Sequence, residues 1–338
     1  MTSSQAYAGP SSKSLGFFAI DRTKILVLLS LLTTWTIAHL LPVYRPVIQG
    51  HIRGKYNAAI QRVPRIKVDW FPDRDPRDQF DTSKVALLIE GRPIPHLVPQ
   101  LLHMITVVPN DWRFVFIGTN ESVTAVSRSF ATQYHIVNGK LDLMVLPYPW
   151  SIDSREDVYR VLTDIRFYEE FLPGAEFLFK FESDSILCAN SPDSLNDWIS
   201  YDWAGASRSA DDGFAGNGGL SLRRVSTVKR ILKFQARFND TDAEDEWFGK
   251  RITSIPGTKV AQGGQETHFA VEDYYYDNNP LGFHVRNGGQ DLADTVWKDP
   301  TQRKEIFDYC RELNMIMPMK LERERCDGDN LKGKIVTV

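Results

Sequence analysis

The chain has 338 residues, of which 42% are hydrophobic and 25% are charged. This composition is typical of a folded protein with a sizeable core, and it excludes a chain that is disordered throughout. The formal net charge of −3 leaves no general basic field of the kind that attracts nucleic acid, so we expect no nucleic-acid partner.

The first predicted element is an apolar run from residue 25 to residue 41, which contains no Asp, Glu, Lys or Arg. Arg22 and Lys24 precede the run and Arg45 follows it, which indicates a transmembrane helix over residues 24–44. The alternative is a cleaved signal peptide. We favour an anchor because the run is long for a signal peptide and no small-x-small cleavage site follows it.

The segments around this span define the expected domain organisation. Basic residues are balanced on its two sides, so their distribution does not decide the orientation. Two glycosylation sequons, at Asn120 and Asn239, would be usable only if the large domain is lumenal. The residues after the span are rich in Arg, Pro and Asp, as in a spacer. We expect a cytoplasmic tail (1–23), the anchor (24–44), a stem (45–80) and a folded domain (81–338).

Within the folded domain, short β-type runs alternate with helical patterns, which predicts βαβ units and a mostly parallel sheet covered on both faces. In such α/β sheets, ligands bind beyond the carboxyl ends of the strands. The predicted strands are 85–89, 113–117, 141–145 and 177–181, and the predicted helices are 97–107 and 154–171.

Two carboxylates follow the fourth predicted strand, in Glu182-Ser183-Asp184. A spacing of two in extended chain puts both on the same side of the strand. Mg²⁺ and Mn²⁺ prefer oxygen ligands, and often take only one or two from protein and the rest from water and substrate phosphates. The alternative is a turn that starts at Asp184, with Glu182 as a solvated strand end.

A glycine-rich segment, residues 213–219, comes next and includes Gly218 and Gly219. Glycines allow positive φ and a close approach of backbone to a ligand, and the following Leu-Ser-Leu-Arg indicates a strand. The alternative is a hairpin, because Asn-Gly is a favoured hairpin turn. The residues themselves do not separate these two interpretations.

An acidic cluster follows at residues 242–246, before Trp247 and Phe248. Acidic residues in the first turn of a helix are favoured by the helix dipole, with Thr241 or Asp242 as the expected cap. The functional interpretation is a general base that accepts the proton of an attacking hydroxyl, for which Asp245 is the first choice and Glu244 the second.

His284 and the cysteines are the remaining candidates for chemistry. His284 follows a glycine bend and is either a structural histidine or the third ligand of a metal. The three cysteines cannot form a dense disulfide framework, but Cys310 and Cys326 could pair in an oxidising lumen, which would leave one thiol free.

Taken together, these segments resemble a family catalogued as a domain of unknown function, DUF5672, whose members look like GT-A-type nucleotide-sugar transferases. The resemblance covers roughly residues 82–290, and the order and spacing of the motifs make it more specific than any one motif. The motifs that carry it are Ile89-Glu90-Gly91-Arg92, residues 181–188, residues 201–206, residues 216–223, residues 244–248 and Gly282-Phe283-His284.

The resemblance implies a metal-dependent glycosyltransferase of the Golgi or endoplasmic reticulum, with type II topology, that moves a sugar from a nucleotide-sugar donor to a glycan or glycoconjugate hydroxyl. In that arrangement Glu90 and Arg92 meet the nucleotide, and Gly218 and Gly219 belong to the donor site. Asp184 and Glu182 hold Mn²⁺ or Mg²⁺, with His284 completing the shell. Asp245 deprotonates the acceptor. Many such transferases have Asp at both ends of the triplet, so the role of Glu182 is less certain than that of Asp184.

Two other classes of function are alternatives to this one. A catalytically silent lumenal homologue, acting as a scaffold or sugar-binding protein, would keep the glycines but lose the acids, whereas Glu182, Asp184 and Asp245 are all present. The third hypothesis is a hydrolase that uses two carboxylates, and this mechanism offers no role for a metal.

Overall fold

The structure is a computed structural model that describes residues 21–62, 75–208, 216–238, 241–273, 276–289 and 292–317, without the side chains of residues 60–62. The chain divides into two compact units, Met1–Phe71 and Pro72–Val338. Asn239, Cys326, most of the predicted tail and residues 63–74 of the predicted stem lie outside the described residues.

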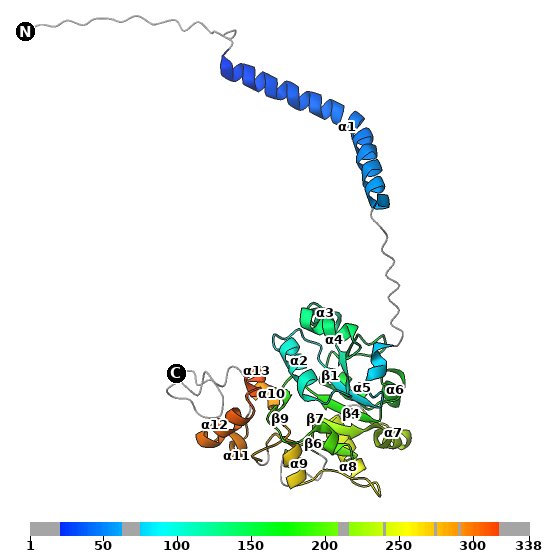
Figure 1. Ribbon diagram of the computed structural model, residues 1–338, viewed down its shortest axis with the longest axis vertical. Helices are drawn as coiled ribbons and strands as arrows, with labels where there is room; N and C mark the ends of the chain where they lie inside the picture. Colours follow the sequence, from blue (N-terminus) through cyan, green and yellow to red (C-terminus); the bar gives the residue numbers. More distant parts are fainter. Residues whose placement is uncertain are drawn as a thin grey trace, which may run out of the picture. The chain divides into compact units, whose positions relative to one another are not determined.

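The amino-terminal unit contains one long helix, α1 (Arg22–Arg62), which bends partway along its length (Figure 1). Pro42 and Pro46 lie inside it, and prolines are a usual cause of such bends because they remove backbone hydrogen bonds. The helix is long and apolar enough to cross a membrane over Arg22–Ala59, so it is a candidate membrane anchor. It also continues through residues 45–62, which were expected to form part of the stem.

The carboxy-terminal unit is built on a six-stranded sheet in the order β3-β2-β1-β4-β7-β6. The first four strands in this order pair in parallel, while β7 runs antiparallel to both β4 and β6. The α/β class and the mostly parallel sheet predicted from the sequence are therefore confirmed. The strands are β1 (Lys84–Ile89), β2 (Arg113–Ile117), β3 (Leu141–Met144), β4 (Phe177–Phe181), β6 (Trp203–Ala206) and β7 (Asn217–Arg224).

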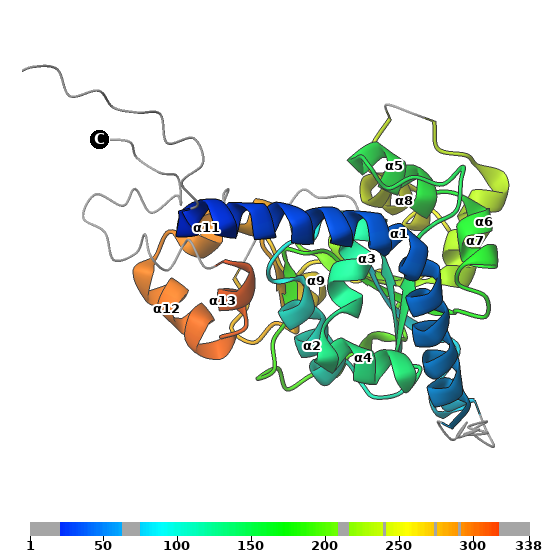
Figure 2. The ribbon, with the colours of Figure 1, turned by 90° about the horizontal axis from the view of Figure 1, so that it is seen from above.

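Helices cover both faces of this sheet, as seen by comparing Figures 1 and 2. The domain has two hydrophobic cores, one on each face of the sheet, because successive side chains of β1 point to opposite faces. Ala86 and Leu88 pack with α2 (Leu97–Val107), whereas Val85 and Leu87 pack with the helices of the other face. The helices of that second face are α5 (Arg155–Leu162), α6 (Ile165–Glu170), α7 (Val225–Phe234) and α8 (Glu244–Ile252).

The predicted elements of the folded domain agree closely with the structure, with two differences in its helices. The single helix expected over residues 154–171 is two helices, because the side chain of Asp164 caps a new helix start at α6. The cap expected at Thr241 or Asp242 is wrong, because α8 begins at Glu244 with Ala243 in the cap position.

A second, three-stranded sheet has the order β5-β9-β8 and stands at the end of β4. Its strands are β5 (Ser185–Leu187), β9 (Gly282–His284) and β8 (Ala270–Val271). The remaining elements are η1 (Pro76–Gln79), α3 (Asn120–Ser127), α4 (Phe130–Val137), η2 (Leu195–Trp198), α9 (Gly264–Phe269), α10 (Arg286–Gly289), α11 (Asp294–Trp297), α12 (Pro300–Tyr309) and α13 (Leu313–Ile316).

A disulfide joins Cys188, which follows β5, to Cys310, which ends α12, with their Cα atoms 5.0 Å apart. Cys310 is therefore not free to pair with Cys326, a pairing that the sequence left open. The fold brings together two buried cysteines that lie 122 residues apart in sequence, and sequence proximity does not predict such a contact.

Candidate functional site

The candidate site begins where β4 ends. The chain leaves β4 after Phe181 and turns, with the backbone N–H of Ser185 donating to the carbonyl of Glu182 (3.1 Å). β5 then pairs antiparallel with β9, and this register sets Ser185 opposite His284. The triplet Glu182-Ser183-Asp184 thus forms a turn and not the extended segment expected, and the turn places Asp184 beside His284.

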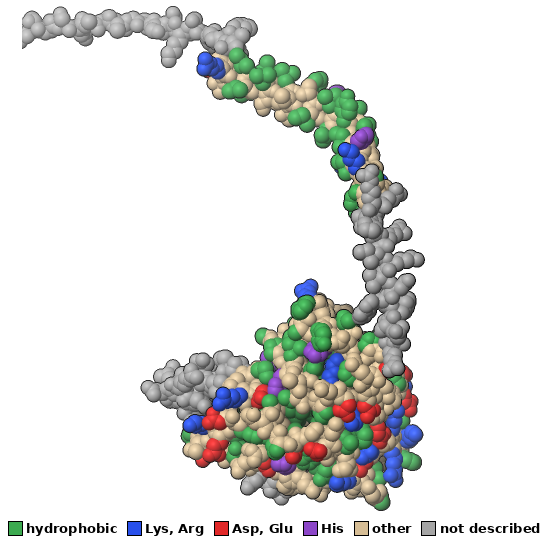
Figure 3. Space-filling view, viewed as in Figure 1, with side chains coloured by type: hydrophobic (Ala, Val, Ile, Leu, Met, Phe, Trp, Pro, Cys, Tyr) green, Lys and Arg blue, Asp and Glu red, His purple; other side chains and the backbone are tan. Residues whose placement is uncertain are grey.

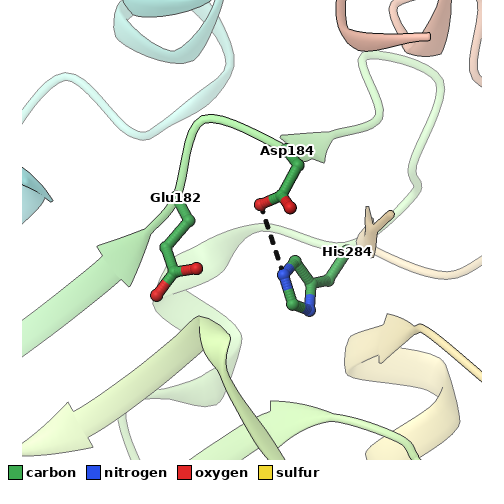
Figure 4. Close-up of side chains that lie close together, drawn as sticks. All are labelled: Glu182, Asp184 and His284. Atoms are coloured by element: carbon green, nitrogen blue, oxygen red, sulfur yellow. Dashed lines mark ion pairs between the residues drawn. The ribbon is translucent and has the colours of Figure 1, made fainter. Parts of the chain in front are cut away.

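Three side chains converge at this turn (Figure 4). The Nε2 atom of His284 lies 3.3 Å from Oδ1 of Asp184, and one ligand atom from each of Glu182, Asp184 and His284 lies within 4.8 Å of the others. His284 is buried, the Asp184 side chain is 21% exposed and the Glu182 side chain is 43% exposed. Two carboxylates and one imidazole form a donor set that suits a divalent metal, so the residues present fit such an ion.

Glu272, which follows β8, holds the other side of the His284 ring. Its Oε2 atom lies 3.2 Å from His284 Nδ1, and its side chain is 1% exposed. Asn217 donates to its Oε1 atom (3.3 Å), and Arg286 Nε lies 3.5 Å from the same oxygen. A carboxylate on the second nitrogen fixes the orientation of a metal-binding histidine. Glu272 was missed from the sequence, although it follows the apolar run Phe269-Ala270-Val271 much as Glu182 follows β4.

The electrostatics of the site depend on these pairs. Burial alone would lower the pKa of His284, but the carboxylates of Glu272 and Asp184 outweigh it and raise that pKa well above its usual value. Burial would raise the pKa of Asp184, but the hydrogen bond and charge of His284 hold it below its usual value. Burial raises the pKa of Glu272. The cluster therefore favours a charged imidazole between two acids when no ion is bound.

Gly218 and Gly219 of β7 lie directly beneath this cluster. A Cβ atom added to Gly219 would overlap the imidazole of His284, and one added to Gly218 would come within 2.8 Å of Asp245 Cβ. Their N–H groups donate to Asn217 Oδ1 (2.6 Å, from Gly219) and to Asp245 Oδ2 (2.8 Å, from Gly218). The glycines therefore allow side chains to approach the backbone, and their N–H groups are already bonded within the protein.

A buried charge network supports the same strand from the other side. Arg223 is fully buried and donates to both carboxylate oxygens of Glu244 (2.9 and 2.8 Å), with its guanidinium 4.2 Å from the Trp203 ring centroid. Lys180 of β4 donates to Glu182 Oε1 (2.5 Å) and to the carbonyl of Gly218 (2.9 Å). Glu244 is therefore held by Arg223, and Glu182 by Lys180.

Asp245 lies in the first turn of α8 and packs against Gly218. Its Oδ2 atom accepts the Gly218 N–H and its Oδ1 atom accepts the Glu246 N–H, each at 2.8 Å. Arg208 Nη1 lies 3.7 Å from Oδ2. The residue is buried but its side chain remains 10% exposed, unlike the Glu244 side chain at 2%.

Glu90 and Arg92 follow β1, the strand beside β4. Glu90 is buried and accepts three hydrogen bonds from Arg92, through its backbone N–H, Nε and Nη2 at 2.8 to 2.9 Å. Burial would raise the pKa of Glu90, but these bonds and one from Ser183 lower it. The Arg92 side chain is 73% exposed, so the pair presents a guanidinium next to the turn that carries Asp184.

Much of the candidate site lies in a part of the chain that matches a known protein family. Residues 140–284 match the family described as "Protein of unknown function (DUF5672)", which confirms the resemblance seen in the motifs. This match spans Glu182, Asp184, both glycines and Asp245, and ends at His284. No curated protein matches the chain.

The chain also has a low structural similarity to two solved structures. The mannosyltransferase PcManGT from Pyrobaculum calidifontis, in complex with GDP-Man and Mn²⁺, has a TM-score of 0.35 and 14% identity, covering 62% of this chain and 60% of its own. An active-site mutant of LgtC has a TM-score of 0.35 and 12% identity, covering 56% of this chain and 75% of its own.

The buried pair of Arg223 and Glu244 yields a stability prediction. We expect Glu244→Gln to lower the free energy of unfolding by about 3–5 kcal/mol, because it leaves the Arg223 guanidinium buried without its counter-charge. Chemical denaturation followed by tryptophan fluorescence measures this loss. Glu246→Gln on the same helix is the control, since Glu246 pairs with Lys250 at the surface and its loss costs about 0–1 kcal/mol. Equal effects of the two substitutions would contradict the network.

Proposed function

We propose that the chain is a metal-dependent glycosyltransferase that moves a sugar from a nucleotide-sugar donor to a hydroxyl of a glycan or glycoconjugate. The observation that carries this proposal is the meeting of Glu182, Asp184 and His284 at the carboxyl end of β4. That edge of an α/β sheet is where ligands bind. A divalent ion bound by these side chains can also bind a diphosphate.

The proposed metal ligands are Asp184 and His284, with Glu182 as a weaker or water-mediated partner. The assignment follows their contacts, because Asp184 faces His284 while Glu182 is paired with Lys180. A Mn²⁺ or Mg²⁺ ion held here supplies a Lewis acid that offsets negative charge on the departing nucleoside diphosphate. Glu272 orients the imidazole, and Gly219 gives it room.

Donor binding is assigned to the end of β1. The exposed guanidinium of Arg92 offers a planar fork of donors, which suits an anionic or hydroxyl-rich nucleotide. Glu90 holds that guanidinium in place and stays ionised because of the hydrogen bonds it accepts. Gly218 and Gly219, expected in the donor site, contribute by letting His284 and Asp245 pack closely against β7.

Asp245 is the proposed general base for the acceptor hydroxyl. Two backbone N–H groups hold its carboxylate in one orientation, and the side chain keeps some exposure. Glu244, the second candidate from the sequence, is instead a proposed positioning residue. Both of its oxygens are bonded to Arg223, so neither is available to an acceptor.

A lumenal location is the proposed setting. The disulfide of Cys188 with Cys310 supports an oxidising compartment, because cytosolic thiols are kept reduced. Asn120, in the first turn of α3, is exposed, whereas Ser122 of its sequon is buried in the folded domain. With α1 as the anchor, these features support a type II membrane protein of the Golgi or endoplasmic reticulum.

Metal-linked nucleotide binding tests the proposal. We expect the full-length protein to bind a uridine or guanosine diphosphate only with Mn²⁺ or Mg²⁺, and Asp184→Asn to weaken that binding about 100-fold or more by removing a ligand. Isothermal titration calorimetry with and without EDTA measures it. Asp308→Asn, the same change at an exposed position of α12, is the control. Nucleotide binding that ignores the metal would contradict the proposal.

The role of Asp245 is tested separately from binding. Asp245→Asn should leave metal-dependent nucleotide binding intact and reduce turnover about 10²–10⁴-fold, the usual contribution of a general base. Release of nucleoside diphosphate from a donor panel with mixed glycan acceptors measures turnover. An unchanged rate would show that another group takes the proton. Binding without turnover in the wild-type protein, with every donor, would favour a catalytically silent sugar-binding homologue.

A further inference from the structure

A cavity of about 620 Å³ lies between α7 and α8, a size typical of small-molecule sites. None of its lining residues belongs to the cluster of Glu182, Asp184 and His284, so it is a separate feature of the domain. The lining residues are Arg230, Ile231, Phe234, Gln235, Asp242, Lys250, Arg251, Ser254, Ile255 and Pro256.

The charge of this cavity is unbalanced. Lys250 lies 2.8 Å from carboxylate oxygens of both Asp242 and Glu246, so these acids are already engaged. Within the part of the chain that the structure describes, no carboxylate forms an ion pair with Arg230 or Arg251. Two guanidinium groups therefore line a concave surface without a direct ion-pair partner among the described residues. Asp242 is the one carboxylate among the lining residues, against three cationic groups, and this excess of positive charge favours an anionic ligand.

The guanidinium of Arg251 is oriented by contacts within the protein. Its Nε donates to Gln235 Oε1 (2.6 Å) and its Nη1 to the Trp247 carbonyl (2.8 Å), while its guanidinium carbon lies 3.9 Å from the Trp247 ring centroid. Burial lowers the pKa of Arg251, whereas the Glu244 pair outweighs burial and raises that of Arg223. The charge of Asp242 acts on Arg251 in the opposite direction, but burial outweighs it.

The remaining lining groups suit a ring that carries hydroxyls. Phe234, at the end of α7, is 83% exposed and supplies an aromatic ring to the lining. Gln235 and Ser254 add polar side chains that can hydrogen-bond to hydroxyl groups. In Figure 3, Lys and Arg side chains gather on the lower right of the domain, over α7 and α8.

We propose that the cavity between α7 and α8 is a second binding site, for an acidic saccharide that carries carboxylate, sulfate or phosphate groups. Arg230 and Arg251 bind the anionic group, and Phe234 stacks against a sugar ring. If the proposed glycosyl transfer is correct, on which this step rests, the ligand is a charged part of the acceptor glycan. A bilayer is the less suitable partner, because Arg251 is partly buried in a concave wall.

Calorimetry on the full-length protein tests the site, in a nonionic detergent whose head group contains no sugar. The probes are a tetrasaccharide of alternating glucuronic acid and N-acetylglucosamine, a neutral N-acetylglucosamine tetramer, inorganic phosphate, and glycerophosphoserine as a lipid head group. We expect the acidic tetrasaccharide to bind at least about tenfold more tightly than the other three, because one charge-assisted contact is worth about that factor.

Substitutions assign the binding to the cavity. Arg230→Gln, at an exposed position, should weaken acidic tetrasaccharide binding about tenfold, and Arg251→Gln should weaken it at least as much. Lys233→Gln is the matched control, because it removes one exposed charge from α7 outside the cavity. An equal effect of Lys233→Gln would overturn the proposal, since it would show only a general attraction to basic surface.

Three other results would also overturn it: equal binding of the neutral tetramer, equal binding of inorganic phosphate alone, or preferred binding of glycerophosphoserine, which would indicate a lipid contact. Metal-dependent nucleotide binding is measured on the same Arg230→Gln protein and should be unchanged. Absence of acidic tetrasaccharide binding in the wild-type protein rejects the cavity assignment, whereas absence of metal-linked nucleotide binding in the wild-type protein rejects the proposed transferase and leaves the cavity assignment standing.

Discussion

The antiparallel pairing of β5 with β9 is the contact on which the candidate site depends. It sets Ser185 opposite His284, and the backbone N–H of Val285 donates to the carbonyl of Asp184 (2.8 Å), so the acid and the imidazole are fixed by main-chain hydrogen bonds. The disulfide between Cys188, which follows β5, and Cys310 links the same small sheet to the end of α12. Asp184, after the end of β4, thereby meets His284, which lies a hundred residues later in the sequence.

A second constraint is the number of charged side chains that are buried around β7. Lys180, Arg223, Glu244, Glu272 and His284 are all buried, and each has an oppositely charged partner. Burying charge is costly unless the partners are well placed, so this region is poorly suited to stability alone. Such clusters are concentrated at functional sites, which is consistent with the proposed role of the neighbouring turn.

Patterns local in sequence predicted the fold well. The strands Arg113–Ile117 and Phe177–Phe181 and the helix Leu97–Val107 have the bounds expected from hydrophobic runs, because each buries a face whose period the sequence displays. The break at Asp164 was missed because a cap inside an otherwise periodic run is a local side-chain effect. The helical continuation of α1 past Pro46 was missed because proline composition was taken to indicate a spacer.

Contacts between distant segments were less predictable. His284 was identified as a potential third ligand only by its order after the acidic motifs, and the structure brings it to Asp184. Glu272 was missed because its role depends on the register of β8 and β9, which no local pattern specifies. The pairing of Cys310 with Cys188 depends in the same way on the tertiary contact between β5 and α12.

The most direct measurement of the central claim is diffraction at the manganese absorption edge from crystals grown with Mn²⁺ and a nucleoside diphosphate. The account predicts an anomalous peak in direct contact with Asp184 and His284, with diphosphate oxygens on its open side and Glu272 still bound to the imidazole. A structure with bound nucleotide, no manganese at this position and Asp184 still paired with His284 would contradict it.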